Sequence, residues 1–277
     1  MVSLLGGADI RALADRLGVV PTKKLGQNFV TDPNTIRKIV AAAKLNGTEH
    51  VVEVGPGLGS LTLGLLEVVD SVTAIEVDSK MAAAIESTVA ERAVGKTFRL
   101  ITQDALTVQT LDPAPNAFVA NLPYNISVPV LLSFLERFES IEKGLVLVQA
   151  EVAHRLVAQP GSKIYGAPSA KFAWWAKSAL VGNIGRNIFW PVPNVDSALV
   201  FFERRESPLA GEELRKITFE VIDAAFGQRR KTLRQALSGW AGSAAAAEAI
   251  LNKVGISPQL RGEQLTVEQF LKIAQSK

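Results

Sequence analysis

The residues best suited to chemistry stand in one short run, Asn121-Leu122-Pro123-Tyr124, directly after an apolar stretch of strand length. An amide side-chain oxygen and a neighbouring backbone carbonyl can both accept hydrogen bonds from one amino group. The proline restricts the backbone direction, and the tyrosine offers a ring on which a base can stack. The run is therefore suited to holding the exocyclic amine of an extruded purine. A proline-rich turn at a strand end is the plainer alternative.

Such an amine is a poor nucleophile, because its lone pair is delocalised into the aromatic ring. Two acceptors on its hydrogens favour a pyramidal nitrogen with a free lone pair, which can attack an activated methyl group in line. Alignment of the reactants and acceptors aimed at the developing positive charge would supply the rate enhancement. The run therefore predicts methyl transfer to an adenine 6-amino group.

A glycine-rich segment upstream joins a strand to a helix: residues 53–60 read EVGPGLGS. Glycines at such a turn let backbone amides approach a ligand at the helix N-terminus. The G-x-G-x-G spacing differs from the G-x-G-x-x-G of dinucleotide-binding folds, and the segment by itself can be no more than a turn. It becomes informative together with the strands that follow.

Two acidic residues follow the next two expected strands. Glu76 comes about 20 residues after the glycines, where its carboxylate can accept bonds from both ribose hydroxyls of an adenosine-bearing cofactor. Asp104 follows the third strand and can accept from an adenine amino group. Alone, either acid is more simply a loop or capping residue. Three such features at successive strand ends predict an adenosine-bearing cofactor.

Apolar runs of strand length alternate with amphipathic stretches from residue 51 onward. Runs that are apolar on both faces predict an α/β fold with a parallel sheet covered by helices on both sides. Two later runs, 179–181 and 198–202, are expected to close the sheet as an antiparallel edge. We expect strands at 51–54, 72–75, 98–101, 117–120 and 145–148, a helix from about Ser60, and a helix capped by Ser79 that ends near Ala93.

The pattern changes after Glu203, where Ser207-Pro208 and Gly211 interrupt the chain and helical periodicity follows. We therefore expect a domain boundary near Glu206. The first domain would span residues 1–206, including an N-terminal helical segment at 1–48, and a small helical domain would span 207–277.

A basic cluster lies within this helical tail, in a chain whose net charge is +3. Such a patch can pair with phosphates and bind RNA in a salt-dependent way. A solvated helix face explains the charge equally well. The cluster consists of Arg229, Arg230, Lys231 and Arg234.

Composition excludes several classes of site. The chain has no cysteine, which rules out disulfides, thiolate metal sites and cysteine nucleophiles. With His50 and His154 as its only histidines, it offers no basis for a histidine-rich metal site. The N-terminus lacks a signal-peptide pattern, and the uncharged run 113–135 contains too many prolines for a membrane helix. We expect a cytoplasmic monomer without a membrane partner.

The chain resembles the ribosomal RNA adenine dimethyltransferase family along nearly its whole length. The matching motifs are KLGQNF at 24–29, the glycine turn, Glu76, Asp104, residues 121–124, FWPVPNVDS at 189–197 and FGQRRKTL at 226–233. The first and last motifs are specific to the family. The resemblance implies a Rossmann-like class I methyltransferase sheet of seven strands, mostly parallel with an antiparallel edge, followed by a small all-α domain that binds RNA or the ribosome.

The resemblance also implies S-adenosylmethionine as methyl donor, S-adenosylhomocysteine as product, and no metal. The implied cofactor site consists of Gln27, Asn28, Val30, Gly55, Gly57, Glu76, Val77, Asp104, Ala105 and Asn121. The implied catalytic set comprises Asn121 and the Leu122 carbonyl as amine acceptors, Pro123, and Tyr124 and Phe189 flanking the base. The basic cluster would contact the RNA.

Family members dimethylate two neighbouring adenosines in a hairpin near the 3′ end of 16S rRNA, so the implied substrate is 16S rRNA in an immature small subunit. Ala167-Pro168 depart from the Leu-Ser-Val segment of many relatives, which bears on substrate geometry more than on chemistry.

Three alternatives stay open: a large-subunit rRNA adenine methyltransferase, a non-catalytic ribosome-binding factor, and a DNA adenine methyltransferase. The 226–233 motif favours the small-subunit enzyme, and the intact run 121–124 argues against loss of catalysis.

Overall fold

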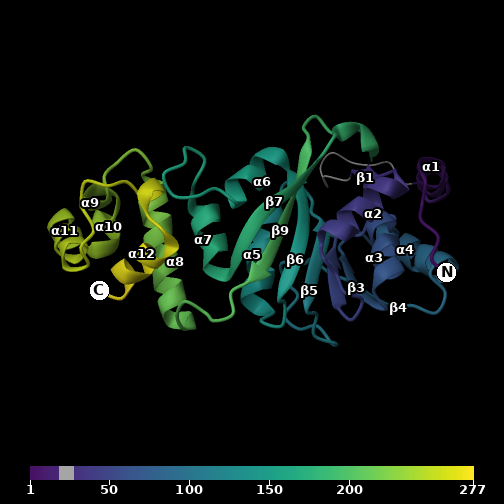
Figure 1. Cartoon of the computed structure of the whole chain (residues 1–277), viewed down its shortest axis with the longest axis horizontal. Coiled ribbons are helices and arrows are strands. Elements are labelled where there is room, and N and C mark those ends of the chain that lie inside the picture. The colour runs from purple at the N-terminus through teal and green to yellow at the C-terminus, as the bar shows by residue number, and fades with distance from the viewer. Residues whose placement is uncertain (19–27) are drawn as a thin grey trace. The chain divides into compact units, whose positions relative to one another are not determined.

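The computed structural model describes residues 1–18 and 28–277 (Figure 1). By its internal contacts the chain divides into two compact units. The first unit contains Met1–Ala153 and Ala179–Arg204, and the second contains His154–Ser178 and Arg205–Lys277.

The first unit is built on a seven-stranded sheet with the order β4-β3-β2-β5-β6-β9-β7. Neighbouring strands from β4 to β6 pair in parallel, and β9 pairs antiparallel to β6. The mostly parallel sheet with an antiparallel edge is therefore confirmed. The strands are β2 His50–Val54, β3 Ser71–Glu76, β4 Thr97–Thr102, β5 Ala117–Asn121, β6 Lys143–Gln149, β7 Ala176–Ile184 and β9 Ser197–Arg204.

A helix follows each of the parallel strands β2, β3, β5 and β6, whereas β4 leads directly into β5. A short strand pair forms a separate two-stranded sheet, and Figure 1 labels its first strand, β1 (Phe29–Val30). In that pair, β1 runs antiparallel to β8 (Phe189–Trp190), so two segments distant in sequence meet. A 3₁₀ turn, η2 (Arg186–Ile188), precedes β8. The helices are α1 Gly7–Arg16, α2 Pro33–Ala42, α3 Ser60–Val68, α4 Ser79–Arg92, α5 Ser127–Arg137 and α6 Ala150–Leu156.

The inner strands β2, β3, β5, β6 and β9 are buried on both faces of the sheet, to which their successive side chains point in turn. The edge strands β4 and β7 are partly exposed. Val51 and Val119 belong to the core that α2, α3 and α4 cover. Phe118, the neighbour of Val119, instead packs on Phe134 of α5, with ring centroids 5.2 Å apart. This two-sided burial explains why the strands read as apolar runs without alternation.

The helix starts in the first unit show local capping. Asp32 caps α2 by accepting from the Thr35 N–H at 2.9 Å, and Pro33 occupies the first turn, where no intrahelical donor is needed. The N-cap of α4 is Asp78, which accepts from the Lys80 N–H at 2.8 Å. The expectation that Ser79 caps this helix is therefore wrong by one residue. Asp78 and Ser79 both have short side chains that can accept a hydrogen bond. Asp78 is the residue before the first helical turn, and its carboxylate therefore reaches the free N–H groups of that turn.

The uncharged run 113–135 forms β5, a loop and the first part of α5, which ends at Arg137. Within residues 1–18 and 28–277, none of the helices combines the length and the apolarity that crossing a bilayer requires.

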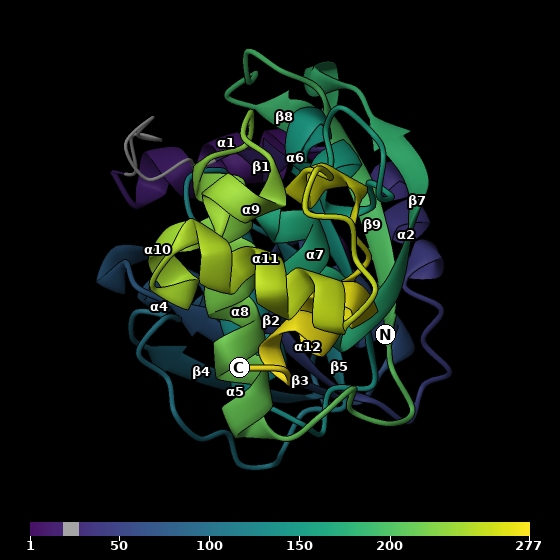
Figure 2. The same cartoon turned by 90° about the vertical axis from the view of Figure 1, so that its left-hand side faces the viewer.

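The second unit is helical, and Figure 2 shows α8, α9, α11 and α12 grouped together. Its core places Val221 and Ile222 of α8 with Phe270 of α12, all of them fully buried. The Thr266 hydroxyl and the Gln269 side chain cap α12 reciprocally. The helices are α7 Ala167–Trp175, α8 Glu212–Gly227, α9 Leu233–Ala236, α10 Ser238–Ala241, α11 Ala244–Lys253 and α12 Val267–Ala274, with a 3₁₀ turn η3 at Gly262–Gln264.

Residues 154–178 group with this helical unit, whereas the sequence analysis placed them in the domain 1–206. The reason is packing: Tyr165 is 2% exposed and lies in the same core as Val221 and Leu233. Pro168 lies in the first turn of α7, a position that tolerates proline.

Gly144 of β6 tests the packing of the sheet. A Cβ there would press against the Phe118 carbonyl and lie 2.5 Å from Phe202 Cζ. We expect Gly144→Ala to lower the free energy of unfolding by about 1–3 kcal/mol through overpacking. Chemical denaturation measures this. Gly182→Ala in β7 is the control, since its Cβ would meet Leu199 at an ordinary 3.4 Å; equal losses in both variants would contradict the packing argument.

Candidate active site

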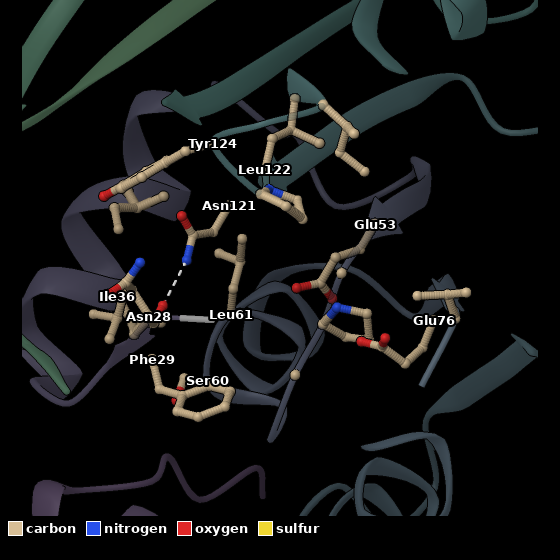
Figure 3. A pocket seen from close by; sticks show the side chains of 18 of the residues that line it. Asn28, Phe29, Ile36, Glu53, Ser60, Leu61, Glu76, Asn121, Leu122 and Tyr124 are labelled. Carbon is tan, nitrogen blue, oxygen red and sulfur yellow. Dashed lines mark hydrogen bonds between the residues drawn. The ribbon is translucent and has the colours of Figure 1, made fainter. Parts of the chain in front are cut away.

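A pocket opens at the carboxyl ends of β2, β3 and β5, where parallel α/β sheets bind ligands. It brings together most of the residues that the sequence analysis assigned to the site (Figure 3). Those that line it are Asn28, Val30, Gly55, Gly57, Glu76, Val77, Asn121, Leu122, Pro123 and Tyr124.

The glycine turn between β2 and α3 forms one wall. Gly57 has a φ of +56°, and a Cβ there would lie 2.7 Å from Phe29 Cε1. The position therefore needs glycine for two reasons, the left-handed backbone and the ring packed over it. The turn brings its backbone to the pocket and leads directly into α3 at Ser60.

Glu76 ends β3, and the residue is 8% exposed. The Asp78 N–H donates to its Oε1 at 2.9 Å. Burial raises the pKa of Glu76, and hydrogen bonds from the backbone of Asp78, Gly57 and Val77 act in the opposite direction. These donors hold the carboxylate at the strand end, where it lines the pocket.

Glu53 is a second buried acid in the same pocket, 1% exposed on β2. The Thr62 hydroxyl donates to its Oε2 at 2.6 Å. Burial raises the pKa of Glu53 to about 8, and the nearby negative charge of Glu76 acts in the same direction. The carboxyl is therefore protonated at neutral pH as long as no positive charge enters the pocket.

The pocket suits a cationic ligand. Its described lining contains Glu53 and Glu76 and no lysine, arginine or histidine. The Ser60 hydroxyl is also buried there and has no hydrogen-bond partner among the described residues. Two acids without a basic partner, together with a free hydroxyl, fit the positively charged sulfonium cofactor that the resemblance implies.

Asn121, the last residue of β5, has its carboxamide oriented by a hydrogen bond. Its Nδ2 donates to the Asn28 carbonyl at 3.1 Å, and Figure 3 shows its oxygen directed away from Asn28. Within the described residues, neither Asn121 Oδ1 nor the Leu122 carbonyl accepts a hydrogen bond. The Leu122 N–H is held by the Leu147 carbonyl at 3.1 Å. Two acceptors that an amine can use therefore lie next to each other.

Tyr124 supplies a half-buried ring to the same pocket. Its hydroxyl shares a 2.8 Å hydrogen bond with the Ser197 hydroxyl. Burial raises the pKa of Tyr124, so the phenol is neutral across the physiological range.

Four predicted residues are not among the described lining. Gln27 lies outside the described residues. Asp104 is exposed, and its Oδ1 accepts from the Leu106 N–H at 2.9 Å, which caps its own turn. Ala105 is buried next to it. Phe189 is 2% exposed and lies in the core, so its side chain is not available at the pocket surface.

The basic cluster is divided by its ion pairs within the second unit. Arg229 pairs with Glu263 at 3.2 Å and also donates to the Lys163 and Tyr165 carbonyls. Arg234 pairs with Glu248 at 2.7 Å. The two remaining members, Arg230 and Lys231, are exposed and make no ion pair in the described part of the chain.

Glu53 and Ser60 both lie within the glycine motif, and the sequence predicts a role for neither. A signal for Glu53 was present, since an acid inside the run Val51-Val52-Glu53-Val54 must be buried if both faces of the strand are covered. Ser60 carried no comparable signal, because a serine at a helix start is ordinary.

The chain matches the family model described as ribosomal RNA adenine dimethylase over residues 21–277. Two similar curated proteins are both named ribosomal RNA small subunit methyltransferase A. That of Streptomyces griseus is 60% identical over 99% of this chain and 96% of its own length. That of Thermobifida fusca is 57% identical over 98% of this chain and 96% of its own length.

Solved structures with similar folds include a dimethyladenosine transferase from Plasmodium falciparum, with a TM-score of 0.75 and 24% identity over 88% of this chain and 95% of its own. The 23S rRNA methyltransferase ErmE gives a TM-score of 0.68 and 25% identity over 90% of this chain and 98% of its own. At its identity, the first of these bears on the fold alone.

The buried Glu53 carboxyl predicts a pH effect on stability. Its folded-state pKa of about 8 lies above the ordinary 4.5, so its contribution to stability is full below the unfolded pKa and is lost as pH rises towards 8. Without ligand, Glu53→Gln should remove this loss, which is on the order of 1 kcal/mol per pH unit. Denaturant unfolding across this pH range measures the slope. Glu86→Gln, at an exposed site on α4, should keep the wild-type slope; an unchanged slope in Glu53→Gln would sink the assignment.

Proposed function

The chain belongs to the ribosomal RNA adenine dimethylase family, and from this membership we propose that it transfers methyl groups from S-adenosylmethionine to the 6-amino group of adenines in small-subunit ribosomal RNA. The names of its relatives at 57–60% identity support the small-subunit RNA over the large. The observation that supports the chemistry is the orientation of the Asn121 carboxamide. Its nitrogen donates a hydrogen bond to the Asn28 carbonyl, so its oxygen can accept one from an amine.

Cofactor binding is assigned to the acids and the glycine turn. When bound, the cofactor supplies an electrophilic methyl group on a positively charged sulfur. Glu76 would accept from the ribose hydroxyls, and Glu53 would face the positive charge of the ligand. We also propose roles for the remaining predicted members, with Asp104 and Ala105 at the adenine end and Asn28, Val30, Gly55, Gly57 and Val77 along the pocket wall. Gln27, which lies outside the described residues, is kept as a proposed cofactor contact from the resemblance alone.

The target amine would donate its two hydrogens to Asn121 Oδ1 and the Leu122 carbonyl. Both acceptors withdraw the nitrogen from conjugation with the ring and stabilise the positive charge that develops on it. Pro123 restricts the backbone that carries the Leu122 carbonyl. Tyr124 would stack on the extruded base and exclude water from the reacting atoms. The proposal assigns stacking to Tyr124 alone, because Phe189, the second predicted base contact, is buried in the core.

We further propose which adenines are the substrate. They are two adjacent adenosines in a hairpin near the 3′ end of 16S rRNA, each methylated twice, within an immature small subunit. We also propose that the enzyme is cytoplasmic and that it acts as a monomer. The monomer is supported by the single pocket in the first unit, which contains the acceptors and both acids. Arg230 and Lys231 would contact RNA phosphates. Arg229 and Arg234, already in ion pairs, would contribute to RNA binding mainly by shaping the second unit.

Asn121→Ala tests the chemistry. We expect turnover to fall roughly 10²- to 10³-fold, because an acceptor aimed at developing charge is removed. Binding to small subunits should stay near wild type, since Asn121 lies in the pocket and not in the basic cluster. Mass spectrometry of adenine nucleosides measures methyl transfer, and sedimentation with subunits measures binding.

The control is Asn34→Ala, which removes an exposed carboxamide from α2. Equal losses of turnover and subunit binding in Asn121→Ala would contradict its assigned role. Wild-type enzyme that methylates only free large-subunit RNA would overturn the proposed substrate.

We expect the members of the basic cluster to differ in their contribution to RNA binding. Reversing Arg230 and Lys231 to glutamate should weaken subunit binding and reduce the slope of log affinity against log salt by about 1 for each phosphate that is no longer neutralised. Arg229→Gln should mainly lower the thermal stability of the second unit, because it breaks the pair with Glu263. Lys272→Glu, exposed on α12, is the control for each single reversal, Arg230→Glu or Lys231→Glu, because it changes the net charge by the same amount. The same salt slope in the double reversal and in wild type would remove these residues from the interface.

A further inference from the structure

The motif at 189–197 contacts a residue of the pocket lining through its last residue. Phe189, at its start, is buried in the core, whereas Ser197, at its end, contacts the Tyr124 hydroxyl. We propose that Ser197 is a positioning residue that fixes the Tyr124 ring, and that this restraint serves the second methyl transfer to each adenine more than the first. The inference rests on the proposed function.

The contact is well supported by its surroundings. The two hydroxyl oxygens are 2.8 Å apart, and Ser197 is 0% exposed. Ser197 is the first residue of β9 and pairs in register with Gln149 of β6. The Ala150 N–H donates to the Asp196 carbonyl at 2.9 Å, which ties the residue before Ser197 to the first residue of α6, directly after β6. The serine hydroxyl is therefore presented by a fixed piece of sheet.

The ring needs such a restraint because its other attachment is a loop. Tyr124 is three residues beyond the end of β5, and its hydroxyl lies at the far end of the side chain. A bond at that end limits both rocking of the ring and movement of the loop that follows Asn121. Since burial raises the pKa of the Tyr124 phenol and keeps it neutral, the pair stays a hydrogen bond between two hydroxyls, which either side can donate.

The two transfers place unequal demands on the ring. An unmodified adenine amine has two hydrogens, one for Asn121 Oδ1 and one for the Leu122 carbonyl. In the first transfer the nitrogen forms a bond to the methyl carbon as the carbon–sulfur bond breaks, and the nitrogen then releases one proton to water. The amine is left with one hydrogen, so only one of these two hydrogen bonds can form. Alignment of the monomethylated amine then depends more on stacking against Tyr124, which needs no hydrogen on the nitrogen. Loosening the ring should therefore slow the second step more than the first.

The experiment uses full-length Ser197→Ala, Tyr124→Phe, the double variant and Ser197→Thr on small subunits. Single-turnover reactions followed by mass spectrometry give separate rates for formation of monomethyl- and dimethyladenosine. We expect Ser197→Ala and Tyr124→Phe each to slow the second transfer about 3- to 10-fold, as fits the loss of one hydrogen bond, and to slow the first less. Monomethyladenosine should accumulate. The double variant should be no slower than either single variant, and Ser197→Thr should restore the wild-type ratio.

Ser127→Ala is the matched control. Ser127 is also buried, but its hydroxyl reaches the backbone carbonyl of Tyr124, at 3.5 Å, and not the phenol. It should keep the wild-type product ratio. Cofactor affinity by calorimetry should be the same in Ser197→Ala and wild type. An unchanged product ratio in Ser197→Ala, or single-variant losses that multiply in the double variant, would overturn the inference.

A spectroscopic readout separates this inference from the proposed function. The chain has two tyrosines, Tyr124 and Tyr165, so ring-labelled tyrosine gives two carbon resonances at the hydroxyl-bearing position. Ser197→Ala should shift the Tyr124 resonance and leave that of Tyr165 in place. Wild-type enzyme without activity on adenines would refute the proposed function, whereas an unmoved Tyr124 resonance would refute the positioning bond.

Discussion

A carboxamide presents a donor and an acceptor of nearly equal size, and its hydrogen-bond partners decide which end faces a ligand. Asn121 commits its nitrogen to the carbonyl of Asn28, 93 residues away along the chain, and so leaves its oxygen for an amine. Asn28 immediately precedes β1, which the antiparallel pairing with β8 holds in place. The chemistry at the end of β5 thus depends on a strand pair outside the main sheet, because movement of that pair would break the hydrogen bond that orients the carboxamide.

The same pocket contains an electrostatic conflict. Glu53 and Glu76 are both buried, and the described lining contains no basic side chain to neutralise them. Burial raises the pKa of both carboxyls, and the charge of Glu76 raises that of Glu53 further, which lowers the stability of the ligand-free protein wherever they ionise. A positively charged ligand would reverse this effect by favouring the ionised forms. The two buried acids that destabilise the ligand-free protein when they ionise therefore also favour binding of a cationic cofactor. A product with a neutral sulfur would gain less binding energy from these two acids.

Much of this arrangement could be predicted from the sequence, because the signals are local. Apolar runs set the strands, the glycine turn marks the start of α3, and Glu76 and Asn121 come at the carboxyl ends of β3 and β5, where a parallel sheet collects its ligands. Long-range pairing could not be predicted in the same way. Phe189 was assigned to the base because of its place in a motif, yet its backbone pairs with Val30 and its ring is buried.

The ion pairs of the helical unit could not be predicted from the sequence either. Arg229 and Arg234 look like their neighbours in the sequence, but Glu263 and Glu248 approach them only once the helices have packed. An arginine that holds two backbone carbonyls and a carboxylate is largely committed to the fold, and a phosphate would have to compete with those partners. Because Arg230 and Lys231 have no such competition among the described residues, the effective positive charge of this surface is about half of what a count along the sequence implies.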